Sequence, residues 1–278
     1  MTTFLSIIIV SYNARKHLED CLGSLSSAPP ATPHEIVVVD NASTDGSARI
    51  VRERWPRVTV IEQSVNVGFA AGNNVGIRAT SGELILLLNN DTIVPKGAVD
   101  ALVARLLARP DAAVAGPRLT DGNGRAELSF GRMIAPFAEL RQKVTLQMYR
   151  RDVEWISRRV ERDTQRERDV DWVSGACLLV RREDAEKVGL LDERYFLYAE
   201  DVDFCAAIRA LGRRVIFTPA AHVVHLGGRS RATAPTAMNV AYRRSQIAFY
   251  EKHHPAWAPV LRAYLRLKGQ LPGPVARP

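Results

Sequence analysis

Short apolar runs alternate with amphipathic segments through the first part of the chain. Runs of β-branched residues and leucine predict strands, and segments with apolar residues every three or four positions predict helices. The expected strands are Ser6–Ser11, Glu35–Val39, Val58–Ile61, Glu83–Leu88 and Ala112–Ala115. The expected helices between them are Lys16–Leu25, Ser47–Glu53, Gly68–Thr80 and Pro95–Ala108. This alternation predicts an α/β fold with a Rossmann-like, mostly parallel central sheet flanked by helices.

The pattern changes in the second half of the chain. Glu139–Asp171 is rich in both signs of charge and has few apolar positions, which indicates a solvated helix or a mobile excursion. Trp172–Val180 resumes the core. A helix that buries one face is expected to begin near Glu200, and Val223–Val224 is expected to form a short strand.

Polar side chains follow the ends of three predicted strands, at Tyr12-Asn13, at Asp40–Asp45 and at Asn89–Asp91. Ligands of such sheets bind at the carboxyl ends of the strands, so these side chains are candidates for one site. The apolar run before Asp91 ends in two amides and this carboxylate. A carboxylate in that place has usually met a basic side chain, a helix N-terminus or a metal ion, and the residues alone leave these alternatives open.

Size and cysteine content narrow the class of protein. A chain of 278 residues can bury a large core in one large or two small domains. The three cysteines lie far apart and form neither a CxxC pair nor a disulfide framework, which favours a reducing cytosol. The first residues lack the signature of a signal peptide, and no apolar run approaches the roughly 20 residues of a membrane-spanning helix.

The net charge of +8 is concentrated at the C-terminal end. From Arg229 onwards there are nine basic residues and one acid, Glu251, so this segment accounts for the whole net charge. Aromatic residues and leucines accompany the basic residues from Tyr242 to Leu271. A basic, partly apolar arm suits an anionic membrane surface. Nucleic acid is the competing partner, and a solubilising helical tail is the third alternative.

Two polar segments suggest nucleotide binding. After its predicted strand, Asp40 either belongs to a turn in which Ser43 caps the next helix, or accepts hydrogen bonds from a base or ribose. The segment Gly68–Gly76, preceded by Asn66, has small residues that allow close backbone approach near a helix N-terminus, which favours phosphate. It has neither the Lys-Ser/Thr of a P-loop nor the spacing of a dinucleotide-binding fingerprint.

Acidic and histidine residues in the second half suggest catalysis. Glu200, Asp201 and Asp203 stand among aromatic and apolar residues. Acids in the first turn of a helix are favoured by its dipole, but a carboxylate held beside apolar neighbours is also a candidate general base. His225 is either a structural histidine or a ligand. The following glycine pair and Arg229 favour a site.

Taken in order, these segments resemble the family 2 glycosyltransferases, whose catalytic domain has the GT-A fold, and above all their bacterial rhamnosyltransferase branch. The resemblance rests on SIIIVSYN, VVVDNASTDGS, NVGFAAGNNVG, LLLNNDTIVP, VSGACLLVRR, GLLDERYFLYAEDVDFC and HVVHLGGRS. It covers most of residues 4–230. It implies a catalytic domain over residues 1–230, followed by a basic helical tail over 231–278. Within the domain, residues 1–118 would bind the nucleotide sugar, and 119–230, including the charged excursion 139–171, would bind the acceptor.

The same resemblance implies roles for individual residues. Asp91 would coordinate Mg²⁺ or Mn²⁺ with His225 as a second ligand, and Asn89 stands where the strict Asp-x-Asp motif has its first acid. Asp201 would be the catalytic base of a direct displacement that inverts the anomeric centre. The donor pocket would comprise Tyr12, Asp40, Asn66, Gly68, Asn73, Asn89 and Asn90. The acceptor site would be bordered by Trp172, Ser174, Gly175 and Glu200.

The resemblance thus implies a metal-dependent inverting hexosyltransferase of cell-wall or surface polysaccharide synthesis. dTDP-rhamnose is the favoured donor, with UDP-galactose or UDP-N-acetylglucosamine as the alternative, and the acceptor is a saccharide, plausibly linked to a lipid. We expect a cytoplasmic enzyme, peripheral on the inner face of the cell membrane through its basic tail, and no nucleic-acid partner. A non-catalytic nucleic-acid-binding protein would explain the tail but would leave Asp91, Asp201 and His225 without a role.

Overall fold

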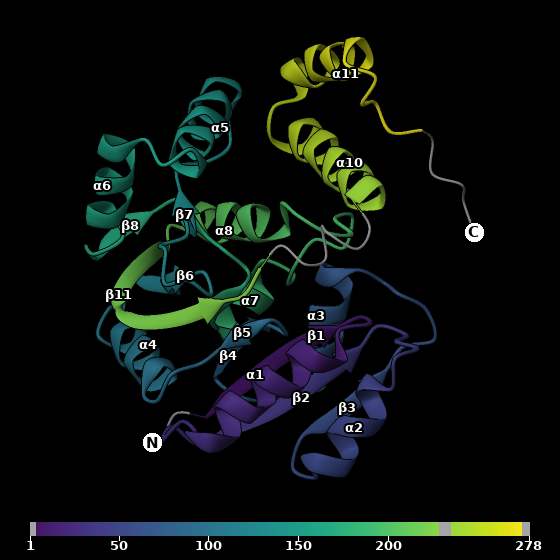
Figure 1. The fold of residues 1–278 in the computed structure, drawn as a ribbon, viewed down its shortest axis with the longest axis vertical. Coiled ribbons are helices and arrows are strands. Elements are labelled where there is room, and N and C mark those ends of the chain that lie inside the picture. Colours follow the sequence, from purple (N-terminus) through teal and green to yellow (C-terminus); the bar gives the residue numbers. More distant parts are fainter. Residues whose placement is uncertain (1–3, 228–234, 274–278) are drawn as a thin grey trace.

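The computed structural model describes residues 4–227 and 235–273 (Figure 1). Three features of the sequence interpretation lie outside the described residues. They are the second glycine after His225, the expected domain boundary at 230/231, and the charges of Arg229, Arg231 and Arg277.

Nine strands form one central sheet in the order β3-β2-β1-β4-β10-β6-β11-β5, with β8 also paired to β11. The first four strands of this order are parallel, β6 and β11 are parallel to each other, and β10, β5 and β8 each run antiparallel to their partners. A separate pair joins β7 to β9. The strands are β1 (Leu5–Ser11), β2 (His34–Asp40), β3 (Thr59–Glu62), β4 (Leu84–Asn89), β5 (Thr92–Ile93), β6 (Ala112–Thr120), β7 (Phe130–Gly131), β8 (Arg168–Val170), β9 (Trp172–Val173), β10 (Cys177–Arg181) and β11 (Arg214–His225).

Helices cover both faces of this sheet (Figure 1). They are α1 (Arg15–Ser27), α2 (Ser47–Arg54), α3 (Phe69–Arg78), α4 (Ala98–Leu107), α5 (Pro136–Arg150), α6 (Glu154–Asp163), α7 (Arg182–Lys187), α8 (Glu200–Ala210), α10 (Pro235–His253) and α11 (Ala258–Leu267). A short 3₁₀ helix, η1 (Pro255–Trp257), precedes α11. The predicted α/β class, the mostly parallel sheet and the alternation of strands and helices in the first half are therefore confirmed.

The strand expected at Val223–Val224 is present, but it is much longer than expected. These residues end β11, which spans 12 residues and pairs with β6 on both sides of an irregularity between Thr218 and His222. Pro219 lies in this irregularity. Because proline cannot donate to the ladder, the strand bulges at this point and then continues. Ser43 does not cap α2 either, since its Oγ accepts a hydrogen bond from the backbone of Asn13.

Strand β1 shows why the core runs are continuously apolar. Successive side chains of a strand point to opposite faces, and both faces of this sheet are covered. Ile7 and Ile9 pack in a cluster with α1, α2 and α4, whereas Ile8 and Val10 pack in a second cluster with α3, α8 and α10. All of β1 is buried, so an unbroken hydrophobic run is needed.

The parallel strands place their polar ends along one edge of the sheet. Ser11, Asp40, Asn89, Thr120 and His225 are the last residues of β1, β2, β4, β6 and β11, respectively. Each therefore stands at the carboxyl edge, where ligands bind in sheets of this kind. Strand pairing thus gathers residues that are more than 200 positions apart in sequence.

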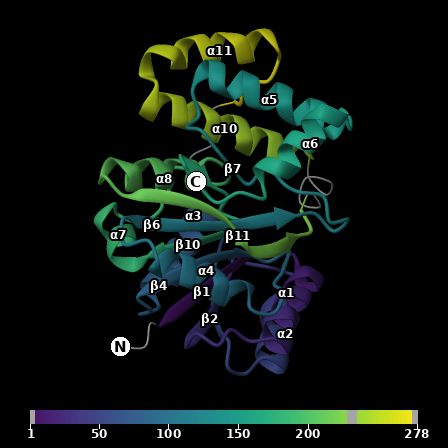
Figure 2. The same ribbon diagram turned by 90° about the vertical axis from the view of Figure 1, so that its left-hand side faces the viewer.

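A helical layer of α5, α6, α10 and α11 lies over this core (Figure 2). The charged stretch that was expected to be a solvated helix or a mobile excursion forms α5, α6 and β8. Its residues are not all directed to solvent, because Tyr149, Ile156 and Val160 form a small buried cluster. The excursion is thus a folded part of the domain.

The C-terminal helix α10 is packed onto this core. The Tyr250 hydroxyl donates to Glu139 of α5 over 2.6 Å, and the Gln246 amide donates to the same carboxylate over 2.5 Å. Lys252 and His253 reach the buried carboxylate of Asp203 on α8 at 2.8 and 2.6 Å. An enzyme truncated after Tyr250 would lose both side chains that contact the Asp203 carboxylate. A truncation at this point would therefore disturb the folded domain as well as the basic tail.

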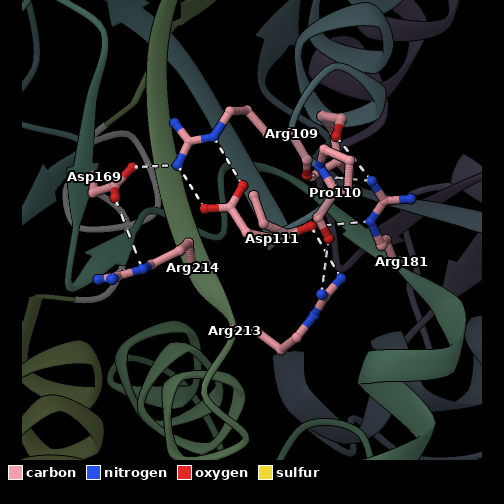
Figure 3. A network of polar contacts seen from close by, with 9 residues as sticks. Arg109, Pro110, Asp111, Asp169, Arg181, Arg213 and Arg214 are labelled. Carbon is pink, nitrogen blue, oxygen red and sulfur yellow. Dashed lines mark hydrogen bonds and ion pairs between the residues drawn. The ribbon is translucent and has the colours of Figure 1, made fainter.

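An arginine network ties the opposite edge of the sheet together (Figure 3). Arg109 forms a bidentate pair with Asp111 at 2.9 Å and also reaches Asp169 of β8 at 3.1 Å. Arg213 donates to the carbonyl of Pro110 over 2.8 Å. The network joins the segments that precede β6 and β11, far from the polar carboxyl edge.

No helix within the described ranges is both long and apolar enough to cross a membrane.

Candidate active site

A cleft of about 930 Å³ opens at the carboxyl edge of the sheet. Its lining comes from the ends of the parallel strands, from the loop after β6, from α5 and from the segment that precedes α8. Predicted donor-site residues that line it are Tyr12, Asn66, Gly68, Asn89, Asn90, Asp91 and His225. The structure therefore brings most of the predicted donor pocket together in one cavity.

Asp91 and His225 face each other in this cleft. His225 Nε2 lies 3.2 Å from Asp91 Oδ1, and the amide of Asn89 lies 3.3 Å from the same ring nitrogen. The pairing of β5 with β11 fixes this approach, because Thr92 is opposite His225 in the register. The other ring nitrogen, Nδ1, lies 3.0 Å from Glu127 Oε2. The imidazole is thus held between two carboxylates.

The two carboxylates set the charge of the ring. Burial opposes a charge on His225, but hydrogen bonds and attraction from Asp91 and Glu127 raise its pKa to about 10. For Asp91, burial acts to raise the pKa, yet the hydrogen bond and charge of His225 hold the pKa below its usual value. His222 lies apart from this group, with Nε2 2.8 Å from the hydroxyl of Thr120.

The donor set suits a hard divalent cation. A carboxylate oxygen and an imidazole nitrogen face each other, and the carboxylate behind the ring is the usual partner of a histidine that ligates a metal. No cluster of three or more His, Cys, Asp or Glu side chains placed to hold a metal ion is found in the part of the chain that is described. Asp91 and His225 would therefore need ligands from phosphate and water.

Three buried oxygens have no hydrogen-bond partner among the described residues, and one of them belongs to Asn41, which lines the cleft. They are Asp40 Oδ2, Asn41 Oδ1 and Asn73 Oδ1, on residues that are almost wholly buried. The second Asp40 oxygen accepts from the Ser43 backbone at 2.6 Å. Unsatisfied buried acceptors are costly, so they indicate a ligand that donates hydrogen bonds, as a base or ribose does. Asn41 was not among the predicted site residues.

Gly68 stands where the chain has no room for a side chain. Its φ of +88° is in the left-handed region, and a Cβ there would lie 2.5 Å from the carbonyl oxygen of Phe196. That carbonyl accepts from Phe69 N over 2.7 Å. The start of α3 is thereby joined to the segment before α8, and Asn66 accepts from Gly68 N.

A second cavity of about 400 Å³ lies between α5 and α10, with α8 and Trp172 also in its lining. Asp201 lines this cavity and not the larger cleft. Four residues line both spaces, so the two adjoin. The shared residues are Gln142, Leu146, Arg150 and Tyr198.

The start of α8 aims Asp201 into this second cavity. Tyr198 and Ala199 both have φ of 70°, an uncommon conformation for residues with a Cβ. Such strain is tolerated when the surrounding structure imposes it, and it often marks a functional site. Asp201 then accepts hydrogen bonds from Gly175 N at 2.9 Å and Val202 N at 2.8 Å. Burial raises its pKa, and these two backbone donors partly oppose the rise.

The two neighbouring acids do not compete with Asp201. Glu200 is buried with one oxygen unpartnered, and burial together with the charge of Asp201 raises its pKa well above the usual value. Asp203 forms an ion pair with Lys252 and also contacts His253. The repulsion expected among three adjacent acids is therefore relieved, and Asp201 is the one of the three that lines a cavity.

The predicted acceptor residues occupy different places. Trp172 lines the second cavity, and its indole donates to the carbonyl of Arg132. Ser174, Gly175 and Glu200 line neither of the two cavities. Gly175 instead supports Asp201 from behind through its backbone N–H.

The sequence interpretation missed Glu127 and the inner face of α5. Glu127 follows β6 in a loop and has no recognisable motif around it. On α5, apolar and polar side chains that line the cavities lie at intervals of three or four residues. This periodicity was a usable signal that the high charge of the segment concealed.

A Rossmann-like sheet with a cleft and a carboxylate–histidine pair at its carboxyl edge defines a nucleotide-sugar transferase of the GT-A type. The chain belongs to glycosyl transferase family 2, whose model matches residues 6–189. It is 32% identical over 288 residues to the N-acetylglucosaminyl-diphospho-decaprenol L-rhamnosyltransferase of Mycobacterium tuberculosis, an alignment that covers 98% of this chain and 93% of the relative. The resemblance to bacterial rhamnosyltransferases is thus confirmed, and the nucleic-acid-binding alternative is not favoured.

Solved structures support the fold. A mannosyltransferase from Pyrobaculum calidifontis, in complex with GDP-Man and Mn²⁺, matches with a TM-score of 0.61 at 20% identity, over 96% of this chain and 70% of that one. TarS 1–349 of S. aureus, in complex with UDP-GlcNAc, matches with a TM-score of 0.58 at 18% identity, over 94% and 71% of the two chains. The chain is a glycosyltransferase with the GT-A fold.

Proposed function

We propose that the protein transfers rhamnose from dTDP-rhamnose to a saccharide joined through a diphosphate to a polyprenyl lipid, with inversion at the anomeric carbon. Two adjoining cavities carry this proposal. One holds the Asp91–His225 pair and Asn41 with its unpartnered buried oxygen, and the other holds Asp201. Similarity to the mycobacterial rhamnosyltransferase supports the choice of sugar and of acceptor.

The donor would occupy the larger cleft. Asn41, which lines this cleft, would accept a hydrogen bond from the base or ribose, and we assign the same role to Asp40 and Asn73 because each also has a buried oxygen without a partner among the described residues. Asp91 and His225 would hold Mg²⁺ or Mn²⁺, whose charge stabilises the leaving diphosphate. Glu127 would keep Nε2 of His225 directed at the ion, because a hydrogen bond at Nδ1 fixes the ring.

The acceptor would occupy the second cavity. Asp201 would take the proton from the acceptor hydroxyl as that oxygen attacks the anomeric carbon from the side opposite the diphosphate. One in-line displacement inverts the centre. Trp172 and Tyr242, both in the lining of this cavity, offer aromatic faces on which a sugar ring can pack. In this division both parts of the domain line the donor cleft, and residues 119–230 supply most of the lining of the acceptor cavity. Tyr242 belongs to α10, so the C-terminal helical extension also contributes to the acceptor site.

A panel of donors tests the function. The protein would be incubated with dTDP-rhamnose, UDP-galactose or UDP-N-acetylglucosamine, with and without an N-acetylglucosaminyl diphospho-prenol, and the released nucleoside diphosphate and the product mass would be measured. We expect transfer from dTDP-rhamnose alone. Transfer from either UDP sugar at a higher kcat/KM would assign a different donor.

We also propose that the enzyme is peripheral on the inner face of the cell membrane. Part of the basic charge of the tail is already paired within the protein, because Lys252 forms an ion pair with Asp203 and Arg262 forms one with Glu251. These two side chains are therefore not free to bind an anionic membrane. Helix α11 offers a better surface. Val260, Tyr264 and Leu267 are each more than half exposed and share one face by their spacing. Exposed basic residues stand at the end of this helix, at Arg266 and Lys268. An apolar strip near basic residues suits an anionic interface.

A further inference from the structure

The inner face of α5 carries two basic side chains to the second cavity. Glu139, Gln142, Lys143, Leu146 and Arg150 follow one another at intervals of three or four residues, so they share a face of the helix. All five line the second cavity. Its other charged lining residue is Asp201. The cavity therefore combines two cations with two carboxylates.

The cations of the two cavities differ in their partners. Lys143 Nζ lies 2.6 Å from Glu139, so its charge is neutralised within the helix. Arg125 of the larger cleft packs its guanidinium 4.0 Å over the Tyr149 ring and pairs with Asp152 at 2.9 Å. The Arg150 guanidinium has no hydrogen bond or ion pair with any residue that the structure describes. Arg150 is thus a cation available to a ligand.

Arg150 stands where the two cavities meet, because it lines both. A diphosphate that entered the second cavity would meet the carboxylates of Asp201 and Glu139, and like charges at short range in a partly buried site repel strongly. A guanidinium offsets this repulsion and can bind phosphate through two parallel N–H donors. In the proposed function the donor diphosphate would lie elsewhere, next to Asp91 and His225 in the larger cleft.

We propose that Arg150 binds the diphosphate of the acceptor, with Lys143 beside it, so that the second cavity selects a saccharide linked to lipid through a diphosphate. This assignment rests on the proposed function, since it takes the second cavity as the acceptor site. It makes Arg150 a determinant of acceptor specificity. The acid–base chemistry remains with Asp201.

The test compares two acceptors that carry the same saccharide. One is its farnesyl diphosphate, and the other is a neutral alkyl glycoside. The variants are Arg150→Gln and, as a matched control, Arg151→Gln, an exposed neighbour that lines neither cavity. Loss of hydrogen bonds to a charged group should raise KM for the diphosphate acceptor about 10- to 100-fold in Arg150→Gln. KM for the glycoside and for the donor should not change, and Arg150→Lys should recover part of the loss.

Two outcomes would overturn the assignment. An equal rise in KM for both acceptors would mean that Arg150 does not recognise the diphosphate, and a selective rise in KM for the donor would assign the residue to the donor. Calorimetric binding of farnesyl diphosphate, with the donor's nucleoside diphosphate present, needs no turnover. If the wild type transfers no sugar to either acceptor, the proposed function fails, and this binding measurement still decides the role of Arg150. Binding unchanged in Arg150→Gln would refute it.

Discussion

Glu127 Oε2 lies 3.0 Å from His225 Nδ1, and Asp91 Oδ1 lies 3.2 Å from the other nitrogen of the same ring, Nε2. The two residues are 98 positions apart and come from the loop after β6 and from the end of β11. A carboxylate in this place fixes the orientation and tautomer of a ligating histidine. Glu127 is therefore a positioning residue for the metal pair, and several predictions depend on this geometry.

The first prediction concerns Glu127 itself. Glu127→Gln should lower the affinity for Mn²⁺ about 10- to 100-fold, because the amide orients the ring less firmly and does not support its basicity. Activity should recover when Mn²⁺ is raised. The measurement is a Mn²⁺ titration of initial rate together with Mn²⁺ binding by calorimetry. Glu154→Gln on α6, whose exposed side chain pairs with Arg158 and lines neither cavity, is the control. An unchanged Mn²⁺ requirement would remove Glu127 from this role.

Loss of the ligand pair should abolish the metal response. Asp91→Ala should weaken donor affinity and the response to Mg²⁺ or Mn²⁺ together, and the wild type should fail in EDTA and recover on adding either ion. The reason is that the leaving diphosphate develops negative charge, which a divalent cation held by Asp91 would stabilise. Rates in chelator and after stepwise metal addition check this. Full activity after exhaustive chelation would reject the metal assignment of both Asp91 and His225.

Asp201→Asn should lower kcat about 10²- to 10⁴-fold, since an amide cannot accept the acceptor proton. Donor binding should change little because Asp201 lines the other cavity. In the wild type, kcat/KM should fall as the pH drops, since the base must be ionised. Burial raises the pKa of Asp201 above its usual 3.8, so this fall should lie above pH 3.8. Near wild-type turnover in Asp201→Asn would exclude it as the base.

Gly68→Ala should be far more damaging than Gly97→Ala. Gly97 is in the left-handed helical region (φ +78°, ψ −4°), where alanine costs about 1–2 kcal/mol, whereas Gly68 (φ +88°, ψ 179°) is in a region that is almost restricted to glycine. The new Cβ has open space at Gly97, whereas at Gly68 it would lie 2.5 Å from the Phe196 carbonyl oxygen. We expect both variants to show a lower melting temperature and Gly68→Ala alone to raise KM for the donor. Equal effects on KM would argue against the close packing at Gly68.

The exposed strip of α11 should control membrane binding. Replacing Val260, Tyr264 and Leu267 together by serine should reduce sedimentation with anionic vesicles and leave the turnover of a water-soluble acceptor unchanged. The physical reason is the lost burial of apolar side chains at the interface. Val65→Ser, on another exposed apolar residue, serves as the control.

Two observations would contradict the membrane assignment. Wild-type binding should grow with the anionic lipid content, weaken in high salt and persist after nuclease treatment. Vesicle binding that the triple variant retains in full would exclude α11 as the surface. Tight binding to DNA or RNA, with no binding to vesicles at low salt, would instead assign the basic charge to nucleic acid.

The amino-acid sequence by itself determined the sheet and the edge at which the site lies. Strands buried on both faces need unbroken apolar runs, so β1, β2 and β4 were visible without a structure. The polar residues directly after them, Asp40 and Asn89–Asp91, had to gather at one edge because parallel strands end together. Each strand and the polar residues at its end could be predicted from the short stretch of sequence that contains them, because both follow from local backbone geometry.

Only the tertiary structure decided how the second half completes the site. Glu127 reaches His225 through a loop contact between distant positions, which no local pattern encodes. The high charge of α5 predicted a solvated helix, yet its inner face lines both cavities and carries Arg150. The tail charge suggested a free arm, but Lys252 and His253 are bound to Asp203 beside the candidate base. Whether a charged side chain faces solvent or forms an ion pair depends on which residues lie near it, and these neighbours are set by the tertiary structure.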